Sequence, residues 1–388
     1  MRASGDGGRT RVVQLVNCLG LGGTERQFVE LLRGLDRSRF DSEVFALNRV
    51  GELLPAVREL GFDPAELHLK GTLLRPNTLV QVARLARHIR TSKAHLVHCH
   101  DFYSNLVGSA AARLAGVPYL VARRDLGAWI GPNQARALRL TTRLAPKILC
   151  NALAIRDRLV DVEHQDPARI VVVPNGLDVD RFDREAARPL ESPLAVLDGP
   201  GPVVVVVSNM KHPVKGHAEF LVTAHAVLRA MPEARFLLVG DGALRPQLET
   251  RARELGIAHA VVFAGRRIDV PALLGRCQLA VSASHSEGLS NALMEAMAAR
   301  LPVVATGVGG NVELVRDGRT GFVTPHGDLS ALAQRMIELA RDRVLARRLG
   351  LAGRRRIEEE LSARRMTERI TALYAELTGD AAEARRAA

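Results

Sequence analysis

Two glutamates, Glu287 and Glu295, flank a short polar turn in the run SEGLSNALMEAMAA. Ser290 is a suitable N-cap and residues 291–299 are mostly strong helix formers, so we expect a helix to begin at this turn. The amide groups of a first helical turn attract phosphate, and ionised glutamate accepts strong hydrogen bonds from hydroxyl groups. The pattern therefore favours a ligand that carries both phosphates and vicinal diols, such as a nucleotide sugar. The alternative is that these acidic residues only complement the helix dipole.

Two lysines follow an apolar run of the second half, in the segment SNMKHPVKG. Lys211 and Lys215 are two of only five lysines in the chain. Because lysine presents a compact positive charge that suits phosphate, we interpret Lys215 as a phosphate ligand rather than as a solvated surface residue.

Glycines follow the first apolar run, in the segment LGLGGTE. Gly22 and Gly23 would let backbone amides approach a diphosphate closely, although a tight turn from strand to helix needs the same glycines. The segment is not a GxGxxG motif with an acidic residue about twenty positions later, so a dinucleotide site is disfavoured.

These residues need strands and helices to hold them, and strand-like runs alternate with helical ones along the chain. We expect strands near 11–17, 43–47, 95–99, 118–122, 147–150 and 170–173 in the first half, and near 203–208, 235–239, 261–264, 279–282 and 302–305 in the second. The alternation predicts an α/β protein with two doubly wound, Rossmann-like domains. Ligands of such sheets bind at the carboxyl ends of the strands.

The proline-rich segment 184–202 has the composition of a linker. We therefore expect an N-terminal domain over residues 1–183 and a C-terminal domain over residues 184–360. Residues 361–388 are expected to be helical and to pack back towards the N-terminal domain.

Composition limits the partners of the protein. The chain has 54 basic and 42 acidic residues, a formal net charge of +12, and 4% aromatic residues. Basic and aromatic residues do not interleave, so no binding to nucleic acid is expected, and an anionic small ligand or a membrane surface explains the sign of the charge as well. One helical face is a candidate for peripheral contact with an anionic membrane, with a solvated face as the alternative. It consists of Arg136, Arg139, Arg143 and Lys147.

The apolar runs are all much shorter than a membrane span, and the N-terminus lacks the apolar core of a signal peptide. A cytoplasmic location is therefore expected. The four cysteines show no CxxC or Cys/His metal spacing, and we interpret them as reduced, buried thiols.

Several motifs follow one another along the chain: GGTER, HCHDF at 98–102, VVPNGLDVDRF at 172–182, SNMKHPVKG, VGDG at 239–242, VVFAGR at 261–266, EGLSNALMEAMA and GVGGNVELVRDGRTGFV. Together they resemble the family 4 retaining glycosyltransferases of GT-B fold, in which two Rossmann-like domains face each other across a cleft. The resemblance covers most of residues 11–325. It implies transfer of a sugar from a UDP- or GDP-linked donor to a glycan or lipid-linked acceptor, in bacterial polysaccharide or cell-envelope glycan biosynthesis.

The resemblance also implies roles for single residues. Glu295 is expected to receive the ribose hydroxyls of the donor, Glu287 the hydroxyls of the transferred sugar, and Lys215 the diphosphate. His100 is expected to contact the sugar or to settle the reaction geometry, with a capped surface histidine as the alternative. His100, Glu287 and Lys215 thus form the expected catalytic set. Further donor contacts are expected from Gly22, Gly23, Asn209, Lys211, Gly288, Leu289, Ser290 and Asn291.

Two positions depart from the family pattern. Asn209 stands where many members carry an arginine that pairs with the lysine, and Lys211 would then supply the second positive charge. A histidine often found after the fourth strand is replaced in the segment ARRD. Arg123 and Arg124 are therefore candidates for contact with an anionic acceptor or a phosphate.

No cofactor and no catalytic metal are expected. Asp178 and Asp180 spell the DxD metal motif of a different glycosyltransferase fold, but they follow PNG in the expected linker and are interpreted as structural. Charge stabilisation on the leaving diphosphate would then drive the reaction. Two alternatives are a GT-B-fold epimerase and a non-catalytic nucleotide-sugar-binding partner subunit. The presence of both glutamates and of Lys215 counts against the second.

Overall fold

A computed structural model describes residues 9–69, 75–127 and 130–379. The chain folds as two compact units. The first contains the chain up to Gly176 together with the segment from Ala363 onwards, and the second contains Leu177–Ser362. The division thus falls at residues 176 and 362, whereas composition predicts boundaries at residues 183 and 360. Residues 1–8 and 380–388, which belong to the expected terminal segments, lie outside the described residues.

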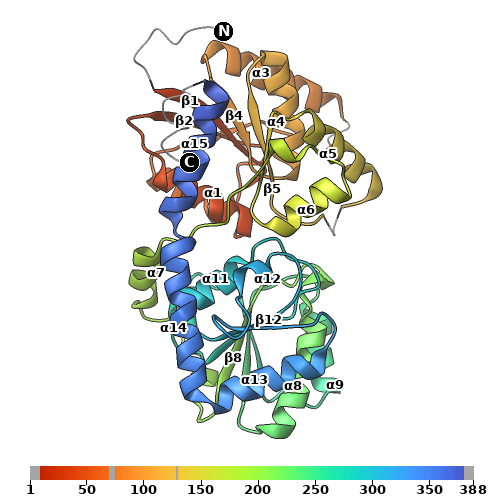
Figure 1. Ribbon diagram of the computed structural model, residues 1–388, viewed down its shortest axis with the longest axis vertical. Helices are drawn as coiled ribbons and strands as arrows, with labels where there is room; N and C mark the ends of the chain where they lie inside the picture. Colours follow the sequence, from red (N-terminus) through yellow and green to blue (C-terminus); the bar gives the residue numbers. More distant parts are fainter. Residues whose placement is uncertain (1–8, 70–74, 128–129, 380–388) are drawn as a thin grey trace. The chain divides into compact units, whose positions relative to one another are not determined.

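The first unit is built on a seven-stranded parallel sheet with the strand order β3-β2-β1-β4-β5-β6-β7 (Figure 1). Its strands are β1 (Thr10–Val16), β2 (Phe40–Ala46), β3 (Ala65–Glu66), β4 (Leu96–Cys99), β5 (Tyr119–Arg123), β6 (Lys147–Cys150) and β7 (Ile170–Val172). Its helices are α1 (Gly23–Gly34), α2 (Leu54–Glu59), α3 (Pro76–Thr91), α4 (Phe102–Ala115), α5 (Pro132–Leu144), α6 (Leu153–Asp161), the 3-10 helix η1 (Pro167–Arg169) and α15 (Ala363–Thr378).

Helices cover both faces of this sheet. Val13 and Leu15 of β1 pack with residues of α3, α4 and α6, whereas Val12 and Val16 pack with residues of α1, α2 and α15. Because both faces are buried, the strands read as nearly continuous apolar runs. Figure 1 shows the last helix, α15, beside α1, although the two are far apart in the sequence. The end of the chain therefore completes the core of the first unit.

The second unit has a six-stranded parallel sheet with the order β10-β9-β8-β11-β12-β13. Its strands are β8 (Val203–Val207), β9 (Arg235–Val239), β10 (Val261–Gly265), β11 (Leu279–Ser282), β12 (Val303–Thr306) and β13 (Phe322–Thr324). Its helices are α7 (Val179–Ala186), η2 (Ala195–Asp198), η3 (Pro213–Lys215), α8 (His217–Ala230), α9 (Arg245–Glu254), α10 (Val270–Leu274), α11 (Asn291–Ala298), α12 (Asn311–Leu314), α13 (Leu329–Arg341) and α14 (Arg343–Glu360).

This second sheet is also covered on both sides. Residues of α8, α9 and α13 pack on one face, and residues of α10, α11 and α14 pack on the other. The predicted α/β class with two doubly wound parallel sheets is therefore confirmed. The short strands β3 and β13 were not expected, because two or three residues give too little pattern to read. No helix among the described residues is both long and apolar enough to cross a membrane.

The expected linker belongs to the second unit. Leu190, Leu194 and Val196 pack against the core on the α11 side of the sheet. Arg267 donates to the hydroxyl of Ser192 at 2.5 Å, which ties the segment to the region after β10. The prolines of this segment thus interrupt regular structure without separating two folded units.

Candidate active site

The loop after β8 brings Lys215 against the segment that follows β11. Gly216 adopts a left-handed backbone conformation with φ of 65°. A Cβ at Gly216 would lie 1.9 Å from the carbonyl oxygen of Ala283, so only glycine lets the loop pack this closely. The backbone amide of His285 donates to the carbonyl oxygen of Val214 at 2.8 Å and holds the same contact.

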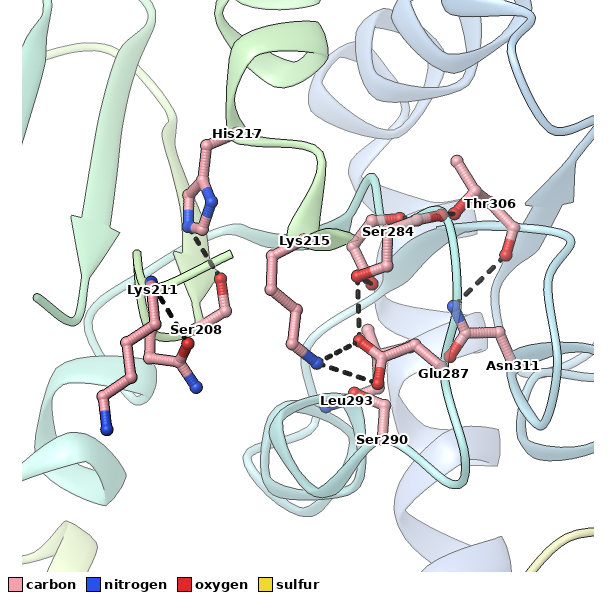
Figure 2. Close-up of polar contacts among 12 residues, drawn as sticks. Ser208, Lys211, Lys215, His217, Ser284, Glu287, Ser290, Leu293, Thr306 and Asn311 are labelled. Carbon is pink, nitrogen blue, oxygen red and sulfur yellow. Dashed lines mark hydrogen bonds and ion pairs between the residues drawn. The ribbon is translucent and has the colours of Figure 1, made fainter. Parts of the chain in front are cut away.

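Lys215 forms an ion pair with Glu287 across this contact (Figure 2). Its Nζ lies 2.8 Å from Oε1 and 3.0 Å from Oε2 of the carboxylate. Ser284 donates its hydroxyl to Oε1 at 2.8 Å and so orients the carboxylate. The side chains of Lys215 and Glu287 are 24% and 11% exposed. The pair therefore offers an ammonium group for an anion and a carboxylate for hydroxyl groups.

Helix α11 begins directly after this carboxylate. The hydroxyl of Ser290 accepts a hydrogen bond from the amide of Leu293 at 3.4 Å, which confirms the predicted N-cap and helix start. The carbonyl oxygen of Gly288 accepts from the amide of Gly310 at 2.8 Å and so holds the turn before the helix. Glu295 lies one turn into α11 and is 9% exposed. Both glutamates thus lie near the start of one helix.

The other predicted donor contacts of the second unit differ in exposure. Leu289 is buried in the core, and Asn291 is half-buried as the first residue of α11. Asn209 and Lys211 are exposed, and the amide of Lys211 donates to the side-chain oxygen of Asn209 at 3.3 Å. Figure 2 shows the Lys211 side chain extending away from the ion pair. Lys211 is therefore an exposed charge that is not part of the ion pair.

His217 opens α8 beneath the same loop. Its Nε2 lies 2.8 Å from the hydroxyl oxygen of Ser208. Burial, together with the nearby charge of Lys215, lowers the pKa of His217 to about 4. The imidazole is therefore neutral at pH 7 and contributes a hydrogen bond, not a charge.

In the first unit, Gly22 is the N-cap of α1 and Gly23 is the first residue of that helix. The carboxylate of Glu25 lies against Gly22, because a Cβ there would lie 2.0 Å from Glu25 Oε2. An anionic group that approaches these amides meets the negative charge of Glu25. The missing side chain at Gly22 leaves room for this carboxylate, and the expected contact of Gly22 and Gly23 with a diphosphate requires Glu25 to move.

His100 directly follows β4 and is completely buried. Its Nε2 lies 2.8 Å from Gln14 Oε1. Gln14 Nε2 donates to the hydroxyl oxygen of Tyr374 at 3.0 Å, and that oxygen lies 2.8 Å from His98 Nδ1. Burial lowers the pKa of both histidines well below the usual range, so both are neutral at pH 7. His100 is therefore not a surface histidine.

The two arginines of the ARRD segment have different environments. Arg123 donates to both carboxylate oxygens of Glu163 at 2.7 and 2.9 Å, and the two side chains are 5% and 9% exposed. This pair satisfies the charge of Arg123 within the fold, which corrects the expectation that Arg123 contacts an acceptor or a phosphate.

Arg124 is placed differently. Its Nη1 donates to the neutral side chain of Asn175 at 3.1 Å, and within the described ranges it forms no ion pair. The buried Nε of Arg124 has no hydrogen-bond partner among these residues. Burial lowers the pKa of Arg124 to about 10, so the guanidinium stays charged at pH 7. Arg124 thus keeps a positive charge available for a ligand.

One residue of the predicted cationic helical face, Lys147, does not lie on the helix. Helix α5 ends at Leu144, and Lys147 opens β6 with its Nζ 2.9 Å from Glu376 Oε1. Lys147 is therefore not part of the helix. The exposed residues of the face are Arg136, Arg139 and Arg143.

Asp178 and Asp180 lie at the start of α7. Asp178 is the N-cap of this helix, and its Oδ1 accepts from the amide of Arg181 at 3.0 Å. Asp180 lies in the first turn, where a negative charge complements the helix dipole. The DxD spelling therefore has a structural explanation here.

Three residues of these sites were missed from the sequence. Ser284 lies in the polar run that follows the strand 279–282, a position that could have drawn notice. Gln14 is a polar residue inside the apolar run VVQLV, which is an informative anomaly for a buried strand. Tyr374 gives no local signal, because its partners lie far away in the sequence.

Comparisons with known proteins extend this description. Residues 21–181 match the domain family described as Glycosyltransferase Family 4, and residues 201–342 match the one described as Glycosyl transferases group 1. A D-inositol 3-phosphate glycosyltransferase of Streptomyces scabiei is 30% identical over 376 residues, which are 85% of this chain and 81% of that protein. The UDP-Gal:alpha-D-GlcNAc-diphosphoundecaprenol alpha-1,3-galactosyltransferase of Escherichia coli is 25% identical over 344 residues, 82% of this chain and 88% of that protein.

A solved structure has the same fold. Anabaena Alr3699/HepE, in complex with UDP and glucose, has a TM-score of 0.82 at 20% sequence identity. The match covers 95% of this chain and 100% of that one.

The chain therefore belongs to the family 4 glycosyltransferases and has the GT-B fold. It is a glycosyltransferase, so the predicted family, fold and enzyme class are confirmed. Transfer of a sugar from a nucleotide-sugar donor in glycan biosynthesis is the reaction that these matches support, and the epimerase and partner-subunit alternatives are not favoured.

Proposed function

We propose that the second unit binds a UDP- or GDP-linked sugar at the Lys215–Glu287 pair. The observation that carries the proposal is the position of this pair at the start of α11, with Ser284 orienting the carboxylate. Lys215 supplies positive charge for the diphosphate, and Glu287 accepts hydrogen bonds from hydroxyls of the transferred sugar. Glu295, one turn further along the helix, receives the ribose hydroxyls.

Further contacts to the donor come from segments around the pair. The turn 288–291 supplies backbone amides at the positive end of α11. Asn209 and Lys211 extend the site on the side of the β8 loop, where Lys211 adds a second positive charge. For Gly22 and Gly23 of the first unit, the proposed contact is of their backbone amides with a phosphate, provided that Glu25 moves aside.

The transfer retains the configuration of the sugar. The acceptor hydroxyl attacks the anomeric carbon on the face of the leaving group, the bond from this carbon to the phosphate oxygen breaks, and a departing phosphate oxygen takes the proton. Lys215 and the amides of α11 stabilise the negative charge that develops on the diphosphate. This charge stabilisation needs no catalytic metal and no cofactor, which fits the role of Asp178 as a helix cap.

The acceptor is proposed to be a glycan or a lipid-linked saccharide that carries an anionic group. Support comes from Arg124, whose half-buried side chain carries a positive charge and lacks an ion pair among the described residues. Two relatives are named for phosphate-bearing molecules, D-inositol 3-phosphate and GlcNAc-diphosphoundecaprenol. A phosphate near the acceptor sugar would compensate the charge of Arg124.

A lipid-linked acceptor requires access to a membrane surface. We propose peripheral binding at the cytoplasmic face through α5, where Leu140 and Leu144 are 60% and 44% exposed beside the three arginines. Each basic side chain contributes about 1 kcal/mol near an anionic surface, so binding is reversible and sensitive to salt. In vesicle flotation with anionic lipid, a variant with Gln at the three arginine positions should lose binding. Flotation that persists unchanged would exclude this face.

The donor site is tested by a screen of nucleotide sugars. The enzyme is incubated with UDP- and GDP-linked sugars, with and without candidate acceptors, and the release of nucleoside diphosphate is followed. We expect release from one donor class, dependent on Lys215 and Glu287. Absence of both release and binding for all nucleotide sugars would refute the proposed function.

A further inference from the structure

A line of polar side chains crosses the apolar interior of the first unit. Gln14 in β1 and His98 in β4 are register partners on neighbouring strands, and both are completely buried. They lie on the sheet face that α15 helps to cover, and Tyr374 of that helix contacts both. Buried polar groups are unfavourable unless they form hydrogen bonds, so such a line inside a core needs a reason.

The hydrogen bonds of this line run in one direction. Gln14 Oε1 can only accept, so its 2.8 Å contact with His100 places the proton on His100 Nε2. Gln14 Nε2 donates to the oxygen of Tyr374 at 3.0 Å. The hydroxyl of Tyr374 then donates to Nδ1 of His98 at 2.8 Å. Each group thereby fixes the proton position of its neighbour.

One nitrogen of each histidine is left over. His100 Nδ1 carries no proton and His98 Nε2 carries one, and neither atom has a hydrogen-bond partner within the described part of the chain. The centroids of the two rings are 3.8 Å apart and their planes are tilted by 36°, and Phe28 packs edge-on against His100 at 4.8 Å. The orientation of His100 is therefore fixed both by packing and by the bond to Gln14. Its Nδ1 is a spare acceptor held in one direction.

We propose that Gln14 and Tyr374 are positioning residues that hold His100 with an unprotonated Nδ1, ready to accept a hydrogen bond from a hydroxyl group of the sugar substrate. The identity of that substrate rests on the proposed function, whereas the proton position of His100 does not. A buried acceptor without a hydrogen bond is unfavourable, and a substrate hydroxyl that donates to His100 Nδ1 supplies the missing hydrogen bond. Through Tyr374, the C-terminal helix α15 thereby helps to fix the proton positions of this line.

Two variants separate the links of the line. Tyr374→Phe removes one hydroxyl and keeps the ring, which packs edge-on against Phe40 at 5.7 Å. Gln14→Met removes both the donor and the acceptor at similar length. Tyr119→Phe is the matched control, because Tyr119 is also buried and its hydroxyl donates to a backbone carbonyl oxygen at 2.7 Å without contact to a histidine.

The proton positions are measured by long-range 1H–15N NMR on full-length protein labelled with 15N-histidine, with signals assigned from single histidine variants. In the native protein we expect the proton on Nε2 of both His98 and His100. In Tyr374→Phe the proton of His98 should no longer be confined to Nε2, and in Gln14→Met the same should hold for the proton of His100. Tyr119→Phe should change neither proton position. A native His100 with its proton on Nδ1 would mean that the line runs in reverse, and it would overturn the proposal.

Kinetics supply the second readout. Gln14→Met should lower kcat by about tenfold, the effect of losing one hydrogen bond, with little change in the KM of the donor. Tyr374→Phe should lower kcat by less, because Gln14 Nε2 still donates a hydrogen bond to the hydroxyl of Ser42 at 3.5 Å in this variant. Unchanged His100 signals and unchanged kcat in Gln14→Met would also overturn the proposal, and if one variant fails to fold the other decides. A native enzyme without transferase activity would refute the proposed function alone, since the NMR signals still report the proton positions.

Discussion

The two units hold their polar groups in opposite ways. In the second unit, Lys215 and Glu287 form a charged pair that is 24% and 11% exposed. In the first unit, Gln14, His98 and Tyr374 form a neutral line that is completely buried. A charged pair near water can exchange its partner for a phosphate of a ligand, whereas a buried neutral line keeps one arrangement because any unpaired group is unfavourable. We therefore assign recognition of the donor diphosphate to the second unit and the fixed orientation of His100 to the first.

The largest effect is expected at the charged pair. Lys215→Met should lower the turnover number by about 100- to 1000-fold, because it removes the group that stabilises the leaving diphosphate. Lys211→Met is the matched variant, and it should lower turnover by less than about tenfold since the exposed Lys211 side chain extends away from the pair. Both values come from nucleoside diphosphate release at saturating donor. A larger loss at Lys211 would move the phosphate contact to that residue.

The two glutamates should separate binding from chemistry. Glu295→Ala should weaken donor affinity by about 10- to 100-fold, because hydrogen bonds to a charged group contribute about 1.5–3 kcal/mol each. Glu287→Ala should reduce turnover more than affinity if its carboxylate acts at the reacting sugar. Isothermal calorimetry and steady-state kinetics measure the two quantities. Unchanged donor affinity in Glu295→Ala would refute the ribose assignment, and the opposite pattern would exchange the two roles.

Lowering the pH should destabilise the unit that contains the buried neutral line more than it destabilises the other unit. A buried histidine with a lowered pKa binds a proton more weakly when folded, so the unfolded chain takes up more protons and stability falls as the pH drops below the unfolded pKa of 6.5. For His217, whose folded pKa is about 4, the loss between pH 6.5 and 5 is about 2 kcal/mol. The first unit has two such residues, His98 and His100.

Hydrogen exchange followed by mass spectrometry, corrected for intrinsic rates, measures this difference. Protection of β1 and β4 should fall more between pH 6.5 and 5 than protection of β8 and β11. Equal loss in both units would mean that the histidine line does not carry the acid sensitivity of the first unit.

Removal of divalent metal should have the smallest effect. Activity in a chelator should stay within about twofold of the untreated enzyme, because Lys215 and helix amides supply the charge stabilisation that a metal would otherwise give. Activity that disappears in the chelator and returns with manganese or magnesium would reject this expectation.

Local patterns predicted the start of α11 correctly. Ser290 caps the helix as expected, and the strand after it, β12, lies within one residue of the predicted range. Both features depend on residues close together in the sequence, where capping and helix propensity act directly. The ion pair of Lys215 with Glu287, 72 residues away, was not predicted; the rule that ligands bind at the carboxyl ends of parallel strands predicted only that each residue lies near a ligand.

Other features depended on distant partners or on a missed signal. The partner of Arg123 is Glu163, 40 residues away, so an isolated ARRD segment gives no sign that one arginine is already paired. Tyr374 meets Gln14 across 360 residues and has no local pattern at all. Lys147 was placed on a helix because its spacing fits, but Pro146 precedes it and disfavours a continuing helix. The proline was the stronger signal.

Calorimetric titration of UDP and GDP into native protein, Lys215→Met and Tyr374→Phe tests the division of roles most directly. We predict that one of the two nucleotides binds the native protein. Its affinity should fall by more than about tenfold in Lys215→Met, where a charge-assisted contact is lost, and stay unchanged in Tyr374→Phe. Equal affinity in Lys215→Met and native protein, or a loss confined to Tyr374→Phe, would contradict the assignment of diphosphate recognition to the second unit.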